Sequence, residues 1–382
     1  MELIWSTEDL VMSGKAYSGF PILLDDYMES CVPVNRFFHK YLLRGSIGSN
    51  RSWPNTGRAL YDFFSYLQVH ELDWCDVDRG EAKSLLAGYR DYCLETCKLS
   101  HNTTRQRLYY ICEFYRFALE NGWIKRLPYS YEERSVNRGS GFFSHIDASG
   151  GKYLANDMLP RPKKEMPRFL RLSEIKELLR VVDNPHHRIM IRLGLHTGLR
   201  REELASFPLA YVFDPSKKGA GGRNVHIKLD PFDGSGMVTK GSVAREILVS
   251  LRFMAELYRY ATTIRGERAS LSKTSHKTLL LNQHGEPYSD DGKSLCRIIG
   301  NAGKKLGIRA HTHMLRHTYA TYTLISLRRI PQSRIEPLVF VQRQLGHSSI
   351  QTTMVYLHLI NEIADDAVLA YDEELNELAE VA

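Results

Sequence analysis

The chain has 382 residues, of which 43% are hydrophobic and 25% charged, and its formal net charge is +7. This length suits about two domains. The chain has neither an apolar run of roughly 20 residues nor a basic start followed by an apolar core, so we expect neither a membrane-spanning segment nor a signal peptide. The six cysteines show no metal-ligand spacing, so we expect no metal site, and reduced thiols in a cytoplasmic protein.

The first predicted domain, residues 20–128, is a small helical bundle. Apolar side chains recur at helical spacing over residues 55–69 and again over residues 103–121, where Asn121 and Gly122 form a typical helix stop. The string SHNTTRQR at the start of the second stretch supplies capping residues and two arginines. The apolar positions of the two stretches are Ala59, Leu60, Phe63, Phe64, Leu67, Leu108, Ile111, Tyr115, Ala118 and Leu119.

Residues 129–167 are predicted to form an extended linker. Glycine is frequent in this segment, which ends in LPRPKKEMP, and such a composition favours a connection over regular structure. Four basic residues near its end could follow a phosphate backbone, but a merely solvated linker explains them equally well. These residues are Arg161, Lys163, Lys164 and Arg168.

The second predicted domain, residues 168–382, is mainly helical with a small sheet. Ser173 is a candidate N-cap of its first helix, and an apolar helix over residues 185–196 stops at Gly198, two residues before Arg200. Three short strands follow, separated by turn residues, and then helices resume. The predicted fold class is therefore mainly α with a small antiparallel β-sheet. The strands are expected at residues 225–229, 237–240 and 245–249.

The C-terminal segment, residues 361–382, contains eight acidic residues and no lysine or arginine, so the positive charge of the chain is concentrated ahead of it. A basic body with an acidic tail suits a protein that binds a polyanion with its body and another partner with its tail. Four apolar residues recur every four positions and predict an amphipathic helix, which could fold onto its own domain or dock elsewhere. They are Ile363, Ala367, Tyr371 and Leu375.

Six side chains of the second domain are suited to holding and attacking a phosphodiester. The arginine guanidinium is a permanently charged fork of donors that matches phosphate, histidine donates or moves a proton near neutral pH, and tyrosine can form a covalent intermediate. Most arginines are surface charges and most tyrosines are packing residues, so no single residue indicates this chemistry. The indication comes from the presence of all six in this order. In chain order the six are Arg200, Lys240, His313, Arg316, His347 and Tyr356.

Local spacing relates the histidines to the second arginine. His313 and Arg316 are three residues apart, which puts both side chains on one face of a helix. His311 and His317 are nearby alternatives that are expected on other faces. His347 follows a glycine that is expected to start a helix, and Tyr356 comes nine positions later.

Spacing also suggests how the first arginine and the lysine are held. Glu203 lies three residues after Arg200, within reach as a helical partner that could orient the guanidinium. Lys217 and Lys228 are neighbours of Lys240 in the strand region. We favour Lys240 because it is expected at a turn between strands, where a side chain can reach a substrate.

Together these strings resemble the tyrosine recombinase family, also called phage integrases. TGLRREEL is similar to the family's first arginine box, HMLRHTYAT to its His-x-x-Arg box, and LGHSSIQTTMVYLH to the box that carries the third activating residue and the nucleophile. MVTKGSVAREILV resembles the β-hairpin that bears the catalytic lysine. The motifs cover about residues 170–360, and the bundle ahead of them resembles the family's core-binding domain in type.

Two segments depart from the family pattern. The segment between Arg316 and His347 is longer than in compact members and contains Arg328, Arg329 and Arg334, which could make an extra DNA contact or an interface. The hairpin region carries a glycine-rich insertion around KKGAGG. Both departures, with the long linker, favour an enzyme of a mobile element.

The resemblance implies a site-specific DNA recombinase or integrase that works through a 3′-phosphotyrosyl intermediate. Tyr356 would attack the scissile phosphate and release a 5′-hydroxyl, while Arg200 and Arg316 stabilise the transition state. No metal ion or nucleotide cofactor is implied, because the phosphotyrosine conserves the bond energy for religation. The resemblance makes His347 a donor to a phosphate oxygen, Lys240 the general acid for the leaving oxygen, and His313 a helper of proton transfer at the tyrosine.

The implied partners are double-stranded DNA recombination sites and further copies of this chain. Recombination needs four strand exchanges, so we expect a homotetramer on two duplexes, with the helix 361–382 docked in trans on a neighbouring copy, and accessory proteins as further candidates. In the cell the protein would be cytoplasmic and associated with the nucleoid when bound to DNA. Candidate DNA contacts of the bundle and linker are Arg105, Arg107, Arg161, Lys163, Lys164 and Arg168.

Two alternative functions are compatible with the same sequence features. A type IB topoisomerase has similar chemistry and would relax supercoils without choosing a site. A DNA-binding protein could also keep this fold without catalysis, but the presence of all six chemical positions disfavours it.

Overall fold

The computed structural model describes residues 1–43, 50–79, 83–135, 152–163, 166–217, 223–289, 291–329, 336–357 and 359–360. The chain folds into two compact units, residues 1–164 and 165–382, each with its own apolar core. Both units are mainly helical and contain only two-stranded antiparallel sheets within the described residues, in agreement with the predicted fold class.

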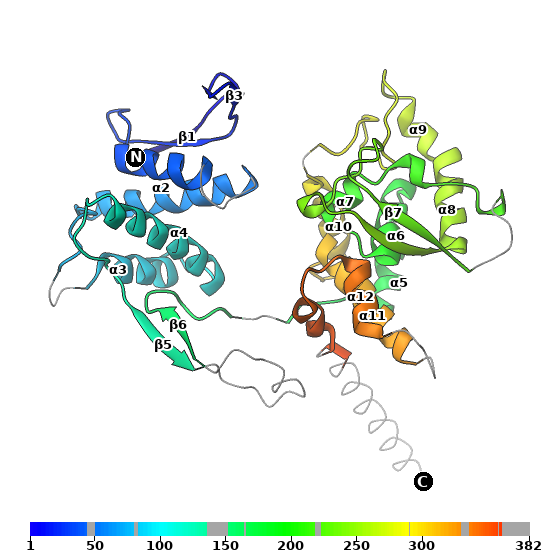
Figure 1. Cartoon of the computed structure of the whole chain (residues 1–382). Helices are drawn as coiled ribbons and strands as arrows, with labels where there is room; N and C mark the ends of the chain where they lie inside the picture. Colours follow the sequence, from blue (N-terminus) through cyan, green and yellow to red (C-terminus); the bar gives the residue numbers. More distant parts are fainter. Residues whose placement is uncertain are drawn as a thin grey trace, which may run out of the picture. The chain divides into compact units, whose positions relative to one another are not determined.

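The first unit is built around two long helices, α2 and α4, which pack against each other (Figure 1). Their buried faces are those predicted from apolar spacing: Phe63 and Ile111 are fully buried. The helix α4 begins because the Ser100 side chain accepts a hydrogen bond from the Thr103 N–H at 3.1 Å, and it ends where Gly122 takes a positive φ of 69°. The helices of this unit are α1 (Val32–Phe38), α2 (Trp53–Val69), α3 (Leu85–Asp91) and α4 (His101–Glu120).

Strands that the sequence did not reveal precede the bundle. The strand β1 pairs with β4, and the short β2 pairs with β3 as a hairpin. The strand β4 packs against α1 and α2, and a Cβ atom added at Gly57 of α2 would lie 2.8 Å from the Pro21 side chain, so this glycine permits the close approach. The four strands are β1 (Glu2–Trp5), β2 (Val11–Met12), β3 (Lys15–Ala16) and β4 (Pro21–Leu24).

The segment predicted as an extended linker also contains regular structure. The strands β5 (Tyr131–Ser135) and β6 (Lys152–Asn156) pair as an antiparallel hairpin within the first unit. The Asp157 carboxylate closes its open end by accepting hydrogen bonds from the N–H and hydroxyl of Ser130, both at 3.0 Å. A wholly extended connection over residues 129–167 is therefore wrong, because these polar side chains and strand pairing hold part of it.

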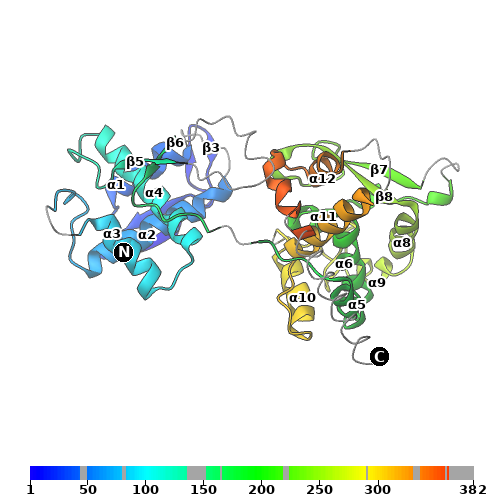
Figure 2. The same cartoon turned by 90° about the horizontal axis from the view of Figure 1, so that it is seen from below.

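Over its described residues, the second unit is a helical domain with one two-stranded ribbon. The helix α11 lies against α6 and α12 in both views of the molecule, and β8 lies against α12 (Figures 1 and 2). No helix that the structure describes is both long and apolar enough to cross a bilayer. Its helices are α5 (Leu172–Arg180), α6 (Pro185–Thr197), α7 (Arg201–Ala205), α8 (Leu251–Thr262), α9 (Arg265–Ala269), α10 (Lys293–Lys304), α11 (Thr312–Arg328) and α12 (Pro337–Leu345), followed by a helical stretch over residues 350–357.

The ribbon consists of β7 (Asn224–Leu229) and β8 (Arg245–Ser250), which pair antiparallel from Asn224 opposite Ser250 to Leu229 opposite Arg245. The third strand predicted at residues 237–240 is wrong. The Val238 N–H donates to the Ser206 hydroxyl at 3.0 Å, so this segment is tied to the end of α7 and not to a strand.

One predicted helix start is also corrected. The helix α5 begins at Leu172 with Arg171 as its N-cap residue, and not after Ser173. The Glu174 carboxylate accepts a hydrogen bond from the Arg171 N–H at 2.7 Å, which stabilises the earlier start. By contrast, α6 ends at Thr197 and Gly198 adopts a left-handed φ of 62°, as the sequence predicted.

Candidate active site

Arg200 is held where α6 gives way to α7. Gly198 ends α6, and Arg200 becomes the N-cap residue of α7. Its N–H donates to Glu203 Oε2 at 2.7 Å, and its guanidinium donates to Glu203 Oε1 at 3.1 Å. The Arg200 side chain is about one-fifth exposed and Glu203 is fully buried. The predicted orienting role of Glu203 thus has a direct geometric basis.

Arg316 lies on α11 and is almost wholly buried. One of its terminal nitrogens donates to the Gly198 carbonyl at 2.7 Å, and the other donates to the Leu345 carbonyl at 2.6 Å. Burial lowers the pKa of Arg316, and the charge of Arg200 lowers it further. Two guanidinium groups brought together in this way make a site that favours an anion.

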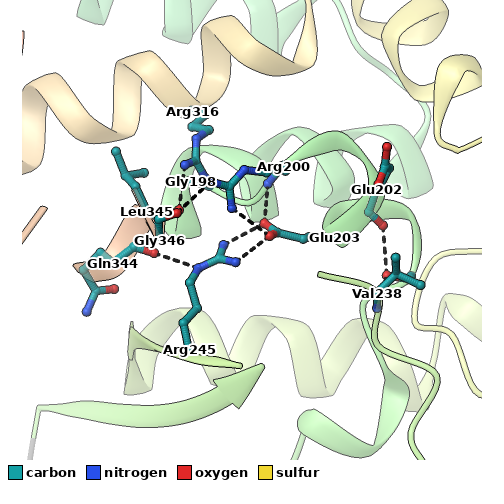
Figure 3. Close-up of polar contacts among 11 residues, drawn as sticks. Gly198, Arg200, Glu202, Glu203, Val238, Arg245, Arg316, Gln344, Leu345 and Gly346 are labelled. Atoms are coloured by element: carbon teal, nitrogen blue, oxygen red, sulfur yellow. Dashed lines mark hydrogen bonds and ion pairs between the residues drawn. The ribbon is translucent and has the colours of Figure 1, made fainter. Parts of the chain in front are cut away.

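The C-terminal end of α12 binds three arginines at three successive carbonyl groups (Figure 3). These carbonyls have no partner within the helix, and the negative end of the helix dipole favours cations beside them. Figure 3 also shows that the three side chains come from different elements: β8, α11 and the start of α7. Gln344 accepts from Arg245 at 3.1 Å, Leu345 from Arg316 at 2.6 Å and Gly346 from Arg200 at 2.8 Å.

Arg245 joins this arrangement to Glu203. Both of its terminal nitrogens donate to the Glu203 carboxylate, and the side chain is nine-tenths buried. Burial raises the pKa of the Glu203 carboxyl, but the hydrogen bonds and charges of Arg245 and Arg200 outweigh it, so the pKa lies below its usual range. Glu203 is therefore a carboxylate that balances part of the arginine charge.

His347 directly follows the end of α12. The predicted helix start at Gly346 is wrong, because Gly346 ends α12 with a left-handed φ of 64°. The His347 N–H donates to the Gln342 carbonyl at 3.1 Å, and its Nδ1 lies 3.0 Å from the buried Thr353 hydroxyl. Burial and the charges of Arg316 and Arg200 lower the pKa of His347 to about 3.

Tyr356 is buried in the helical stretch over residues 350–357, with 1% of its surface exposed. Its ring lies parallel to that of His347, with 6.3 Å between the ring centres. Its hydroxyl oxygen is 3.0 Å from Nδ1 of His317. Burial raises the pKa of Tyr356, and the charges of Arg316 and Arg200 act in the opposite direction.

The two histidines of α11 differ from their expected positions. His317, which was expected on a face away from the site, contacts the Tyr356 hydroxyl. His313 is exposed, and its ring stacks on that of His317 with 5.8 Å between the centres, without a hydrogen bond to a described residue. The expected place of His313 beside the tyrosine is thus taken by His317, because the hydroxyl approaches the later turn of α11.

The structure does not bring Lys240 into contact with the other five residues. Lys240 is exposed in a 3-10 turn, Lys240–Ser242, which lies in the connection before β8. Its ammonium group has no hydrogen bond or ion pair with the described residues. The nearby link from Val238 to Ser206 fixes the preceding chain at the end of α7.

The predicted DNA contacts of the bundle and linker differ in their surroundings. Arg105 donates to the Pro160 carbonyl at 2.8 Å, and Arg107 forms an ion pair with Asp62. The other described candidates are exposed. Lys164 lies outside the described residues, as do Arg334 and the predicted docking helix 361–382. The exposed candidates are Arg161, Lys163 and Arg168.

Two residues of the site, Arg245 and Thr353, were missed from the sequence, and a third, His317, was named only as an alternative. Arg245 lies in the motif MVTKGSVAREILV at the start of a predicted strand, and that position was the available signal. His317 was set aside by helical spacing, and Thr353 had no signal beyond its position between His347 and Tyr356. No three side chains of metal-binding type gather among the described residues.

Comparisons with known proteins identify the family and the fold. The model of the phage integrase family matches residues 168–362. The chain is 25% identical over 357 residues to tyrosine recombinase XerC of Bacillus subtilis (strain 168), which covers 90% of this chain and 97% of that protein. Its fold is similar to that of the XerH site-specific recombinase bound to palindromic difH substrate, with a TM-score of 0.55, 16% identity, and coverage of 91% of this chain and 90% of that one. The Tn1549 transposon integrase in complex with transposon right end DNA gives a TM-score of 0.53 at 16% identity, covering 85% of this chain and 94% of that one.

Proposed function

This chain belongs to the phage integrase family, and we propose that it is a site-specific DNA recombinase in which Tyr356 cuts and rejoins the strands. The observation that carries the proposal is the convergence of two arginines and a histidine around one buried tyrosine. Arg200 and Arg316 are bound to adjacent carbonyls, and His347 follows directly in the chain. The arrangement of the site and the family of the chain both support cutting and rejoining of DNA through Tyr356.

The arginines and His347 would bind the scissile phosphate. Each guanidinium already donates hydrogen bonds to backbone carbonyls, and these bonds fix its orientation before DNA binds. Such preorganised charge is worth several kcal/mol when it faces developing negative charge. In the tautomer in which His347 Nδ1 accepts from the Thr353 hydroxyl, the Nε2–H is free to donate to a phosphate oxygen.

Tyr356 would attack phosphorus and form a 3′-phosphotyrosyl bond while the 5′-oxygen leaves. We assign Lys240 as the general acid for that oxygen, since its exposed turn leaves the ammonium group available to the substrate. We propose that His313, which is exposed on α11 near Arg316, helps to bind the phosphate. Rejoining reverses these steps, and the phosphotyrosine retains the energy of the broken bond, so no metal ion or nucleotide takes part.

The proposed substrate is double-stranded DNA at the ends of a mobile element. The likeness to a transposon integrase and the exposed basic residues of the linker support this substrate. Arg107 is the weakest of the proposed DNA contacts because Asp62 already neutralises it. We place the protein in the cytoplasm, on the nucleoid when it binds DNA.

For the assembly we propose a homotetramer on two duplexes, with residues 361–382 docked in trans and accessory proteins as further partners. The acidic amphipathic sequence of this segment supports docking on a basic body. Truncation after Leu359 should leave single-strand cleavage intact and abolish pairing of two duplexes. Loss of all cleavage in the truncated protein would contradict docking in trans.

Two plasmid assays separate recombination from the other functions. A supercoiled plasmid that carries two copies of the element's joined ends should give deletion or inversion products. A plasmid without those ends should remain supercoiled. Relaxation of both plasmids at equal rates would indicate a topoisomerase, and binding without any cleavage would indicate a silent DNA-binding protein.

A further inference from the structure

We propose that His317 is a catalytic residue that accepts the proton of the Tyr356 hydroxyl during strand cleavage. The inference deepens the proposed function and rests on it, because it requires Tyr356 to be the nucleophile. It assigns the hydroxyl proton of Tyr356 to a histidine that its spacing along the helix would place on a face away from the site.

The position of His317 supports this role. It follows Arg316 on α11, and its Nδ1 lies 3.0 Å from the Tyr356 hydroxyl oxygen, which is within hydrogen-bond distance. The hydroxyl donates to Nδ1 in the ring tautomer that carries its proton on Nε2. Within the described part of the chain, no other group makes a hydrogen bond to this hydroxyl. Tyr356 is 1% exposed, so bulk water has little access to its proton.

The charge state of both groups is the one that a base and its nucleophile need at the start of the reaction. Burial lowers the pKa of His317 to about 4, and the neighbouring His313, Arg316 and His311 act in the same direction. The ring is therefore neutral at neutral pH and can accept a proton. Burial also keeps Tyr356 protonated. A bound phosphate adds negative charge beside the new imidazolium, which favours transfer once DNA is in place.

The other histidines are less suited to the same step. His347 uses Nδ1 for Thr353, and its ring is parallel to the tyrosine ring without a hydrogen bond to the hydroxyl. His313 stacks on the His317 ring and is exposed. Among the described histidines, His317 is thus the one whose ring nitrogen meets the reacting oxygen.

The proposed step is balanced. The O–H bond of Tyr356 breaks and its proton moves to Nδ1 of His317, while the oxygen electron pair forms the new bond to phosphorus. The bond from phosphorus to the 5′-oxygen breaks, and that oxygen takes a proton from Lys240. In rejoining, the 5′-hydroxyl returns its proton to Lys240 as its oxygen attacks phosphorus. The bond from phosphorus to the tyrosine oxygen breaks, and the imidazolium of His317 returns its proton to that oxygen.

His317→Asn is the informative variant, because asparagine can accept the hydroxyl hydrogen bond through its side-chain oxygen but cannot take the proton. On a nicked suicide duplex we expect covalent adduct to form about 10²-fold more slowly than in the full-length wild type. DNA binding measured by gel shift shows whether the variant is folded, and His317→Gln replaces it if binding is lost. His284→Asn, on an exposed loop, is the matched control and should cleave at the wild-type rate.

A duplex with sulfur in place of the scissile 5′-oxygen separates the two proton transfers, since a thiolate leaves without a general acid. This substrate should restore cleavage by Lys240→Ala but not by His317→Asn. Replacement of Tyr356 by 3,5-difluorotyrosine, a more acidic phenol, should accelerate His317→Asn more than the wild type. Equal acceleration of both would show a positioning role and overturn the proposal.

Two further outcomes would also overturn the role of His317: cleavage by His317→Asn within about threefold of wild type, or its rescue by the sulfur substrate. Neither outcome touches the nucleophile itself. If Tyr356→Phe still formed the adduct, the proposed function would fail, and the role of His317 would fail with it. The two failures are therefore distinguishable in one set of reactions.

Discussion

Arg245 and Glu203 form a buried ion pair in which both terminal nitrogens of the arginine donate to the carboxylate. The same carboxylate accepts from Arg200, and Arg245 also donates to the carbonyl of Gln344 at the end of α12. One acid thus connects the ribbon to the arginine that would bind the phosphate. The pair makes the orientation of Arg200 dependent on a residue that need not touch DNA.

Arg245→Met should weaken both stability and cleavage. Breaking a buried ion pair from one side costs about 3–5 kcal/mol, because the remaining charge stays buried. A shift of Arg200 by as little as about 1 Å could slow adduct formation by about 10²-fold. Urea unfolding and a cleavage time course would measure the two effects. Arg252→Met, an exposed arginine on α8, is the control and should change neither, and a loss below 1 kcal/mol in Arg245→Met would refute the burial argument.

Gly346→Ala should disturb the same arrangement from the other side. Gly346 has a φ of 64°, and a Cβ atom there would lie 2.6 Å from Cδ of Arg245. Gly234 has a φ of 75° with no atom within 4 Å of the added Cβ, so Gly234→Ala isolates the backbone cost of about 1–2 kcal/mol. We expect Gly346→Ala to lose more unfolding free energy than Gly234→Ala and to cleave more slowly. Equal losses would mean that Arg245 adapts to the extra methyl group.

Thr353 should tune His347 through a single hydrogen bond. Thr353→Val keeps the shape of the side chain but removes the hydroxyl that lies 3.0 Å from His347 Nδ1. A hydrogen bond of this kind contributes about 1 kcal/mol, which corresponds to about a fivefold loss of cleavage rate. Thr353→Ser keeps the hydroxyl and should cleave close to the wild-type rate. If both variants cleaved equally, the hydroxyl would have no part in holding His347.

Local order in this chain could be predicted from the sequence, whereas contacts between distant residues could not. The buried faces of α2 and α4 follow from apolar spacing, because a helix repeats within four residues. The pairing of β1 with β4 depends on residues far apart, as does the contact of His317 with Tyr356, and helical spacing holds no information on either. Glu203 was assigned to Arg200 because both are on one turn, but its second partner, Arg245, comes from the ribbon.

The stability of the protein should fall as the pH falls below about 6.5. Burial lowers the pKa of His317 to about 4 and of His347 to about 3, against an ordinary histidine value of about 6.5. Between these values the unfolded chain binds more protons than the folded one, so the free energy of unfolding decreases with decreasing pH, by at most about 1.4 kcal/mol per pH unit for each histidine. Urea unfolding at pH 7, 6 and 5 would measure the slope, which should be smaller in His317→Asn. An equal slope in the wild type and in His317→Asn would mean that groups other than His317 cause the pH dependence.

The most direct test of the central claim is the attachment point of DNA in a trapped reaction. A nicked suicide duplex that contains the element's end sequence should yield a detergent-stable adduct with the wild type, and peptide mapping should locate the DNA on Tyr356 through a 3′-phosphate. Tyr356→Phe should bind the same duplex and form no adduct. An adduct in the Phe variant, or DNA mapped to another residue, would contradict the account.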